Sequence, residues 1–331
     1  MMQADVDYVE ALAKSVLAGE RRGLAKGVTL LESTLHAHTC QAQALLERIL
    51  PRTGSSIRVG VTGVPGVGKS TFVDALGALL ISMGRQVAVL AVDPSSTLSG
   101  GSILGDKTRM PRLAVSERAF VRPSPSRGNL GGVARSTREA LLLCEAAGFD
   151  VVLVETVGVG QSEVAVAGMV DVFLLLMLAR AGDELQGIKR GILEMADLVA
   201  ITKADGDNVA HAENACLLYS QALGLLHGNS GSPPPRVVTL SAIADRGIEQ
   251  VWQLIQDRHD AMRSDGVLER KRVTQRRTWF FDTLENAVRS EFFGRAGVRL
   301  HLSEIAGLVE RSEITPEDGA ARLLALQTPQ S

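Results

Sequence analysis

The segment Gly63-Val64-Pro65-Gly66-Val67-Gly68-Lys69-Ser70-Thr71 decides the fold class of this chain. It matches the phosphate-loop pattern G-x-x-x-x-G-K-[ST], in which glycines let consecutive backbone N–H groups close around a phosphate. An apolar run at 57–62 precedes it, and apolar residues at helical spacing follow it as far as Gly84. A strand, a glycine-rich turn and a helix are the context that this motif requires, so the sequence predicts a site for a nucleoside triphosphate.

Two side chains of this loop have separate predicted roles. Lys69 is expected to reach the β- and γ-phosphates, and the hydroxyl of Ser70 is expected to ligate Mg²⁺. The backbone N–H groups and the positive end of the helix dipole are expected to hold the phosphates. The residues of the loop that we predict to bind nucleotide are Gly63, Val64, Pro65, Gly66, Val67, Gly68, Lys69, Ser70 and Thr71.

From residue 57 onward, apolar runs alternate with helical patterns, which indicates a mainly parallel sheet covered by helices on both faces. We therefore expect an α/β phosphate-loop NTPase fold with helical extensions at both ends. The expected strands are 57–62, 86–92, 150–155, 171–178, 198–202 and 236–240. Ligands of such folds bind beyond the carboxyl ends of the strands, so polar residues at those ends are the candidates for function.

Two carboxylates close apolar strands of this predicted sheet. Glu155 is predicted to hold Mg²⁺ directly or through water, and Gly158 to offer a backbone N–H to the γ-phosphate. Asp93 is predicted to hold a metal-bound water. Either acid alone could be an ordinary solvated residue at a strand end. Their combination with a phosphate loop favours metal binding.

The segment 202–205, Thr-Lys-Ala-Asp, is predicted to read the base. The carboxylate of Asp205 can accept the N1–H and 2-amino hydrogens of guanine, whereas adenine lacks that amino group and would leave the acid unpaired. Lys203 can lay its stem along the face of the base. A backbone N–H in the pair Ser241 and Ala242 can meet guanine O6. Thr202 stands where GTP-binding proteins normally carry Asn, so we expect weaker contacts to the base edge.

Two loops are candidates for conformational switching. Residues 93–135 form a polar, glycine-rich insertion that we interpret as switch loops, with Asp106 a second candidate for the metal shell and Arg109 among its charged residues. Apolar residues interleave within it and argue against disorder. The second loop, 180–189, also combines glycines with charged residues. From its residues alone it is equally an ordinary strand-to-helix connection.

The two ends of the chain read as helical. Residues 5–50 are interpreted as a helical cap on the nucleotide-binding domain, with a separate binding module as the alternative. A basic run at 270–277, interpreted as a solvated helix face, leads into Trp279, Phe280 and Phe281, residue types that are enriched at interface centres. A helical arm of this length could pack on its own domain or on a second subunit, and of these we predict a homodimer. The expected parts are an N-terminal extension (1–55), a GTPase domain (56–262) and a C-terminal dimerisation arm (263–331).

Composition narrows the class of function. The net charge of −2 gives no electrostatic case for binding nucleic acid. The three cysteines include no C-x-x-C pair, which is typical of reduced thiols rather than of disulfides or a cysteine metal site. The longest apolar run, 170–179, is too short to cross a bilayer. Acidic residues near the N-terminus argue against a signal peptide. We expect a cytoplasmic protein without nucleic-acid or membrane partners.

Taken together, these motifs resemble the MeaB/ArgK-type P-loop GTPases, close relatives of the human MMAA protein. The resemblance runs from about residue 19 to about residue 326. Glu155, where most GTPases carry Asp, is a mark of the larger class that includes the nickel and cobalamin metallochaperone GTPases. The most specific stretches are 63–71, 92–96, 100–110 and 155–163.

The resemblance implies a homodimeric G-protein chaperone of adenosylcobalamin-dependent methylmalonyl-CoA mutase. Such proteins use GTP to gate cofactor loading and to protect the mutase from inactivation. The resemblance also implies a third mobile loop at 178–189, which favours a functional role for it. The residues predicted to couple nucleotide state to the partner are Arg109, Asp183, Gln186 and Lys189.

Two other functions are weaker interpretations. A nickel-type metallochaperone should show a His-rich tract or paired cysteines, and the sequence has neither. An ATP-dependent kinase is opposed by Asp205. For the GTPase reaction, the predicted catalytic residues are Lys69, Glu155 and Gln161, the last a candidate for positioning water although it is not adjacent to Gly158. Without an arginine committed to the γ-phosphate, slow intrinsic hydrolysis is expected.

Overall fold

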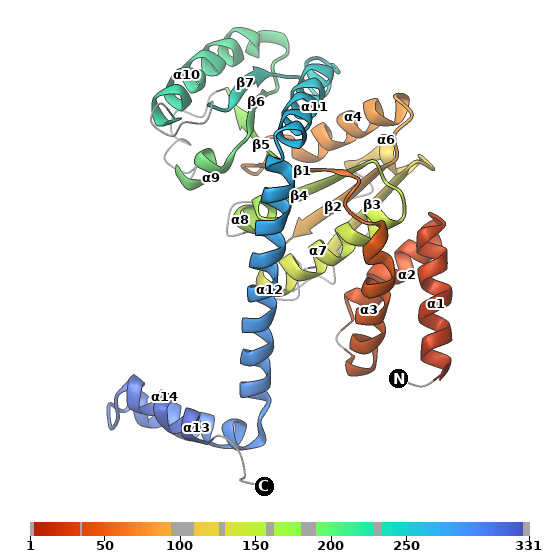
Figure 1. Cartoon of the computed structure of the whole chain (residues 1–331). Helices are drawn as coiled ribbons and strands as arrows, with labels where there is room; N and C mark the ends of the chain where they lie inside the picture. The colour runs from red at the N-terminus through yellow and green to blue at the C-terminus, as the bar shows by residue number, and fades with distance from the viewer. Residues whose placement is uncertain are drawn as a thin grey trace. The chain divides into compact units, whose positions relative to one another are not determined.

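The structure is a computed structural model that describes residues 3–33, 35–93, 109–125, 130–156, 162–179, 190–227 and 234–326. It divides into two compact units, Met1–Gln275 and Arg276–Ser331. Helix α12 (Val267–Gly294) runs across this division, so its first residues belong to the first unit (Figure 1). The first unit contains both the expected N-terminal extension and the expected nucleotide-binding domain.

A parallel sheet forms the centre of the first unit, with seven strands in the described residues and the spatial order β3-β2-β4-β1-β5-β6-β7. Every pairing between neighbouring strands is parallel. The strands are β1 Ile57–Gly63, β2 Val87–Asp93, β3 Ala119–Pro125, β4 Val151–Thr156, β5 Val172–Leu178, β6 Leu198–Thr202 and β7 Arg236–Thr239. Because β1 lies between β4 and β5, the phosphate loop leaves the sheet near the middle of its carboxyl edge. This is the predicted α/β architecture.

Helices cover both faces of the sheet (Figure 1). On one face, α4, α6 and α11 enclose a buried cluster that includes Leu174 and Leu176 of β5. On the other face, α7 and the N-terminal helices α1–α3 enclose a second cluster, which Phe173 of β5 joins. Strands buried on both faces explain the continuous apolar runs of the sequence. The α-helices that the described residues of the first unit form, other than α12, are α1 Gln3–Leu17, α2 Arg21–Leu31, α3 His36–Ile49, α4 Lys69–Ser82, α6 Pro111–Ala114, α7 Leu130–Ala146, α8 Ser162–Ala167, α9 Arg190–Met195, α10 Val209–His227 and α11 Ile248–Ser264.

The interpretation of 93–135 as switch loops was wrong for part of that range. The described residues of this stretch include α6, the edge strand β3 and the start of α7. Phe120 and Val121 of β3 are buried, but the second half of the strand reads Arg-Pro-Ser-Pro. Proline is tolerated at a sheet edge because its missing N–H faces no partner strand. Because these prolines interrupt the apolar run, the sequence pattern did not predict the strand.

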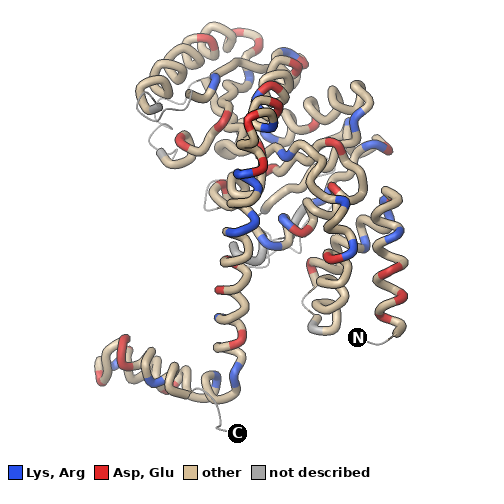
Figure 2. Tube along the Cα trace, viewed as in Figure 1, with Lys and Arg blue, Asp and Glu red and all other residues tan. Residues whose placement is uncertain are grey.

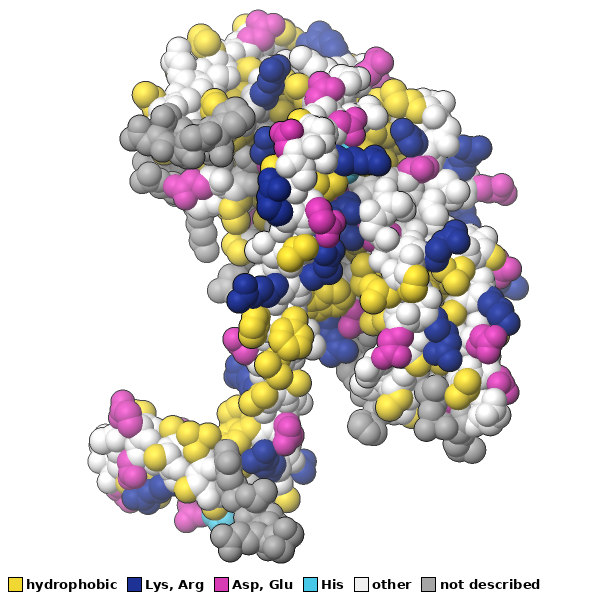
Figure 3. All heavy atoms as spheres, viewed as in Figure 1, with side chains coloured by type: hydrophobic (Ala, Val, Ile, Leu, Met, Phe, Trp, Pro, Cys, Tyr) yellow, Lys and Arg dark blue, Asp and Glu magenta, His cyan; other side chains and the backbone are white. Residues whose placement is uncertain are grey.

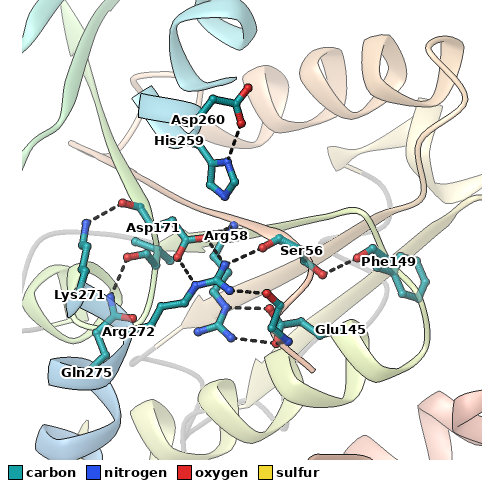
Figure 4. A network of polar contacts seen from close by, with 12 residues as sticks. Ser56, Arg58, Glu145, Phe149, Asp171, His259, Asp260, Lys271, Arg272 and Gln275 are labelled. Carbon is teal, nitrogen blue, oxygen red and sulfur yellow. Dashed lines mark hydrogen bonds and ion pairs between the residues drawn. The ribbon is translucent and has the colours of Figure 1, made fainter. Parts of the chain in front are cut away.

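The basic run at 270–277 lies on α12 (Figure 2). Its interpretation as a solvated helix face was wrong for Arg272, which is 6% exposed. The guanidinium of Arg272 donates from Nε to Asp171 Oδ1 at 2.9 Å and from Nη2 to Oδ2 at 2.7 Å (Figure 4). Lys271 Nζ donates to the backbone carbonyl of Asp171 at 2.6 Å. Hydrogen bonds from Lys271 and Arg272 to Asp171 therefore attach the first residues of α12 to the start of β5.

A second buried ion pair completes this network at the amino ends of the strands (Figure 4). The side chain of Arg58, on β1, donates from Nε and Nη2 to the carboxylate of Glu145 at 2.8 Å each. The backbone N–H of Arg58 also donates to Asp171 Oδ2 at 2.9 Å. The side chains of Glu145 and Asp171 are fully buried. Each buried carboxylate thus has a guanidinium partner, which offsets its desolvation cost.

The second unit comprises the remainder of α12, α13 (Ala296–Glu310) and α14 (Pro316–Ala325). Thr315 caps α14 by accepting the backbone N–H of Asp318 at 3.2 Å, with Pro316 at the first helical position. Hydrophobic side chains gather along this part of α12 (Figure 3). The exposed ones are Phe280, Phe281, Leu284, Val288 and Phe293. Such a contiguous apolar surface is typical of an interaction site.

Candidate nucleotide-binding site

The phosphate loop has the backbone shape for which its glycines are needed. Gly63, Gly66 and Gly68 have φ angles of +150°, +78° and +97°, which residues with a side chain rarely adopt. A Cβ at Gly63 would also lie 2.4 Å from the carbonyl oxygen of Leu176 on β5. The loop then enters α4 directly at Lys69.

A cavity of about 470 Å³ opens beside this loop at the carboxyl edge of the sheet. Its lining combines the loop with the ends of neighbouring strands, and consists of Pro65, Gly66, Gly68, Lys69, Ser70, Thr71, Ala91, Arg109 and Glu155. A larger cavity of about 710 Å³ lies at the amino ends of β5 and β6, lined in part by Val172 and Leu198. We assign the nucleotide to the smaller cavity, because the loop built for phosphate and a helix N-terminus meet there.

Ser70 and Glu155 meet in this cavity. The hydroxyl of Ser70 donates to Glu155 Oε1 at 2.7 Å, and Glu155 is 3% exposed at the end of β4. A hydroxyl and a carboxylate oxygen are the hard donors that Mg²⁺ prefers, so these two residues fit the metal. The side chain of Asp93 and the whole of Asp106 lie outside the described residues. Within the described residues, no group of three or more His, Cys, Asp or Glu could hold a metal ion.

The side chain of Lys69 is held over the phosphate loop by backbone carbonyls of that loop. Its Nζ donates to the carbonyl oxygens of Gly63 at 2.7 Å and Val64 at 3.1 Å. Burial lowers the pKa of Lys69, and the carboxylates of Glu155 and Glu163 partly offset this. Glu163, which is 2% exposed in the first turn of α8, was not among the predicted site residues. Its position in the family-like stretch 155–163 was the available signal.

Thr202 has a structural role that its sequence position did not indicate. It is 3% exposed, and its hydroxyl donates to the backbone carbonyl of Val67 in the phosphate loop at 2.7 Å. The same oxygen lies 3.3 Å from the carbonyl of Met177 on β5. The departure from Asn thus leaves a hydroxyl that joins the end of β6 to the phosphate loop.

The predicted base-reading residues come together at the ends of β6 and β7. The Ser241 hydroxyl donates to Asp205 Oδ2, and the backbone N–H of Ala204 donates to Leu240 O at 3.0 Å. The backbone N–H of Ser241 donates to Arg246 O at 2.9 Å and is therefore used within the protein. Of the predicted pair Ser241 and Ala242, the Ala242 amide is the remaining candidate for guanine O6.

Five of the predicted residues lie outside the described residues, namely Gly158, Gln161, Asp183, Gln186 and Lys189. Their roles stay predictions. Lys203 is described and has a φ of +57°, a conformation that few side-chain residues adopt; Asn208 Nδ2 donates to its carbonyl at 2.7 Å.

A parallel sheet with a phosphate loop after its central strand defines a P-loop NTPase. The chain belongs to the family described as methylmalonyl Co-A mutase-associated GTPase MeaB, whose family model matches residues 24–296. It is accordingly a GTPase, and GTP is its nucleotide. In the part of the chain that the structure describes, no helix has the length and apolar character needed to span a membrane.

Named relatives agree with this assignment. A probable GTPase of Mycobacterium tuberculosis strain H37Rv is 50% identical over 322 residues, covering 97% of this chain and 96% of that protein. GTPase ArgK of Escherichia coli K12 is 47% identical over 305 residues and 92% of each chain. The mitochondrial methylmalonic aciduria type A homolog of Mus musculus is 43% identical over 327 residues, covering 96% of this chain and 79% of that protein. A solved structure titled LAO/AO transport system kinase is 39% identical, with a TM-score of 0.77 and 99% coverage of both chains.

Proposed function

We propose that this GTPase is a homodimeric chaperone of methylmalonyl-CoA mutase that gates adenosylcobalamin loading and protects the loaded mutase. The family description, which names the mutase, carries this proposal. The described cavity supports its GTPase part, because Lys69, Ser70 and Glu155 lie together beside the phosphate loop.

The residues of the cavity divide the work of phosphate binding and hydrolysis. The loop amides and the Lys69 ammonium would hold the β- and γ-phosphates, and a charged lysine there neutralises the developing negative charge. Ser70 and Glu155 would hold Mg²⁺, with Asp93 and Asp106 as further candidates. When bound, the ion screens the phosphate charge and favours departure of GDP. Gln161 is the candidate for orienting water.

The base site would supply specificity for guanine. The Ser241 hydroxyl orients the Asp205 carboxylate by hydrogen bonding to one of its oxygens. The carboxylate can then accept the N1–H and 2-amino hydrogens of guanine. Lys203 would cover one face of the base, and the Ala242 amide would meet O6.

The exposed apolar side chains on α12 beyond residue 276 support the homodimer. Within the second unit, Phe281, Leu284 and Val288 recur at intervals of three and four residues and so share one helix face. A second copy of the same face is a fitting partner, because most soluble homo-oligomers are symmetric dimers with self-complementary interfaces.

Neither alternative function has comparable support. The solved relative is titled a kinase, but a base site built on Asp205 opposes ATP as the nucleotide. A nickel metallochaperone would need soft or imidazole ligands in a cluster. The described residues contain no such group.

Timing of phosphate release with and without purified mutase tests the chaperone proposal. We expect slow hydrolysis by the protein alone and a faster rate with mutase, because a bound partner can supply or order a group that stabilises the transition-state charge. Nucleotide state should in turn alter the affinity for mutase, since coupling between two binding events is reciprocal. Adenosylcobalamin transfer should be followed in the same mixtures by the absorbance of the cofactor. The proposal would be contradicted if mutase left the rate of GTP hydrolysis unchanged and if this protein with GTP left the loading of adenosylcobalamin into mutase unchanged.

A Lys189→Ala variant tests the role of the loop 178–189 separately from the chaperone function. If residues 178–189 couple the two proteins, this variant should keep its basal rate and lose most of the stimulation. Full stimulation would remove the role assigned to Asp183, Gln186 and Lys189, while the chaperone proposal would stand.

A further inference from the structure

The short helix α6 is fastened to the helix that follows the phosphate loop. Asp74 of α4, which is 6% exposed, accepts the backbone N–H of Leu113 at 3.0 Å. Leu113 is fully buried against Gly77 of α4, where a Cβ would come within 2.6 Å of the leucine side chain. Because α4 begins at Lys69, α6 is fixed relative to the phosphate loop.

A bidentate ion pair between Arg112 and Asp245 attaches α6 to the turn 241–246 as well. Arg112 donates from Nη1 to Asp245 Oδ1 at 2.7 Å and from Nη2 to Asp245 Oδ2 at 3.0 Å. The hydrogen bond from Arg112 lowers the pKa of the Asp245 carboxyl group, so Asp245 is ionised at neutral pH. A planar guanidinium paired in this way fixes the orientation of both groups.

Asp245 belongs to the turn that supports the base-reading segment. Two backbone hydrogen bonds of 2.9 Å between Ser241 and Arg246 close this turn. From it, the Ser241 hydroxyl donates to Asp205, and the Arg246 guanidinium donates to the carbonyl of Ala204. Asp245 itself has a φ of +49°, in the left-handed region that Asp adopts more readily than most residues with a side chain.

The chain leads from α6 to the phosphate cavity in a few residues. Met110, which is 1% exposed, is the N-cap of α6 and anchors its start in the core. The preceding residue, Arg109, lines the cavity together with Lys69 and Glu155. Arg109 lies at the phosphate cavity, and the helix that follows it, α6, is joined to the turn 241–246 by the Arg112–Asp245 pair.

We propose that the Arg112–Asp245 pair couples guanine binding to recognition of the terminal phosphate, with both residues acting as positioning residues for Arg109. This inference rests on the proposed GTP site. A base that engages Asp205 fixes the turn 241–246, the ion pair holds α6 in register with that turn, and α6 presents Arg109 to the phosphates. The side chains of Arg112 and Asp245 are 45% and 56% exposed, so we expect a modest coupling of about two- to fivefold.

The test compares the affinities for GDP and for a non-hydrolysable GTP analogue in Arg112→Gln and Asp245→Asn. If the pair positions Arg109, both variants should lower the preference for the triphosphate by about two- to fivefold. If the two charges acted on the phosphates only through long-range electrostatics, the preference for the triphosphate would shift in opposite directions in the two variants, because one variant removes a positive charge and the other a negative charge. The reversed pair, Arg112→Asp with Asp245→Arg, should restore the preference, and the effect should shrink in high salt. Glu10→Gln, which breaks the exposed Lys14–Glu10 pair on α1, is the control.

The outcomes separate this inference from the proposed function. Preferences that shift in opposite directions, or a reversed pair that restores nothing, would overturn the coupling while GTP binding stands. Unchanged preferences in both single variants would overturn it as well. Failure of the unmodified protein to bind either nucleotide would remove the GTP site itself. Thermal melts of each variant confirm that the folded state is being measured.

Discussion

The hydroxyl of Thr202 at the end of β6 donates a 2.7 Å hydrogen bond to the backbone carbonyl of Val67 in the phosphate loop. The base-reading and phosphate-binding segments are thus joined by one buried side chain. Thr202→Val keeps the shape and removes the donor. The change removes about 1–2 kcal/mol of support for the loop shape that binds phosphate. Because bound nucleotide then has to restore that shape, we expect the affinities for GDP and GTP to fall together, by at most roughly five- to thirtyfold. Titration with fluorescent nucleotides measures both. Thr202→Ser keeps the hydroxyl and should bind normally; a valine variant with unchanged affinity would contradict the role.

Lys69→Met should abolish triphosphate binding without unfolding the protein. Burial lowers the pKa of Lys69 from its ordinary value of 10.5, so the folded protein bears a desolvation cost while this lysine is charged. The cost is fully present at neutral pH and is relieved as pH rises through the folded-state pKa toward the unfolded-state value. Unliganded Lys69→Met should therefore equal or exceed the wild type in thermal stability at neutral pH, and this advantage should shrink in alkali. Lys14→Met on the exposed face of α1 is the control. A folded methionine variant that binds GTP normally would remove Lys69 from the site.

Asp205→Asn should exchange one nucleotide specificity for another. Losing a charge-assisted pair with guanine costs on the order of 2–4 kcal/mol, a loss of tens- to several-hundredfold in GTP affinity. Xanthosine triphosphate, whose 2-oxo group suits an amide, should bind the variant better than it binds the wild type. Competition titrations with GTP, ATP and xanthosine triphosphate measure this. Equal binding of ATP and GTP by the unmodified protein would contradict the assignment of Asp205.

The ion pair between Asp171 and Arg272 should matter for stability. Both side chains are buried, and Asp171→Asn leaves the guanidinium without its charge partner at a cost of about 3–5 kcal/mol. Unfolding in urea, followed by circular dichroism, measures the change. Replacing both residues by apolar ones of similar volume should cost less than the single change, because no buried charge is then left unpaired. Glu10→Gln on α1 should have no measurable effect. If the double replacement proves the worse of the two, the hydrogen bonds of Asp171 and Arg272 to neighbouring backbone groups, rather than their charge pairing, hold this end of α12.

The sequence was sufficient where structure depends on local pattern. Gly63–Lys69 form a loop whose positive φ angles require glycine, so the motif itself carries the backbone shape. Strands β4 and β6, which carry Glu155 and Thr202, were predicted because burial on both faces makes each strand a continuous apolar run. Strand β3 escaped because Pro123 and Pro125 interrupt its pattern at the sheet edge.

Contacts between distant residues could not be predicted in the same way. Arg112 and Asp245 are separated by 133 positions, and a surface ion pair leaves no periodic signal in a single sequence. The basic run containing Arg272 looked like a solvated helix face, because charge patterning does not reveal the buried carboxylate of Asp171, which directly precedes β5. Thr202 looked like a weakened base contact, since the position of the Val67 carbonyl depends on the packing of β6 beside the loop.

The exposed apolar face of the second unit gives the last prediction, on the proposed homodimer. Leu284 is 46% exposed on α12, on the same helix face as Phe281 and Val288. Leu284→Glu should raise the dimer dissociation constant by roughly 10- to 10²-fold, because a symmetric interface loses the burial of two half-exposed leucines at about 0.7–1.5 kcal/mol each.

Ser290→Glu adds the same charge about half a turn around the helix from Phe281, where a single-face interface would not reach. Sedimentation velocity across a range of protein concentrations would measure both variants against the wild type. A monomeric wild type would reject the homodimer. A dimer that Ser290→Glu disrupts and Leu284→Glu leaves intact would place the interface on the other side of α12. If Leu284→Glu yields a folded monomer that still hydrolyses GTP, the interface and the nucleotide site are separable. Mutase stimulation of that monomer would then decide whether the chaperone acts through one subunit or requires two.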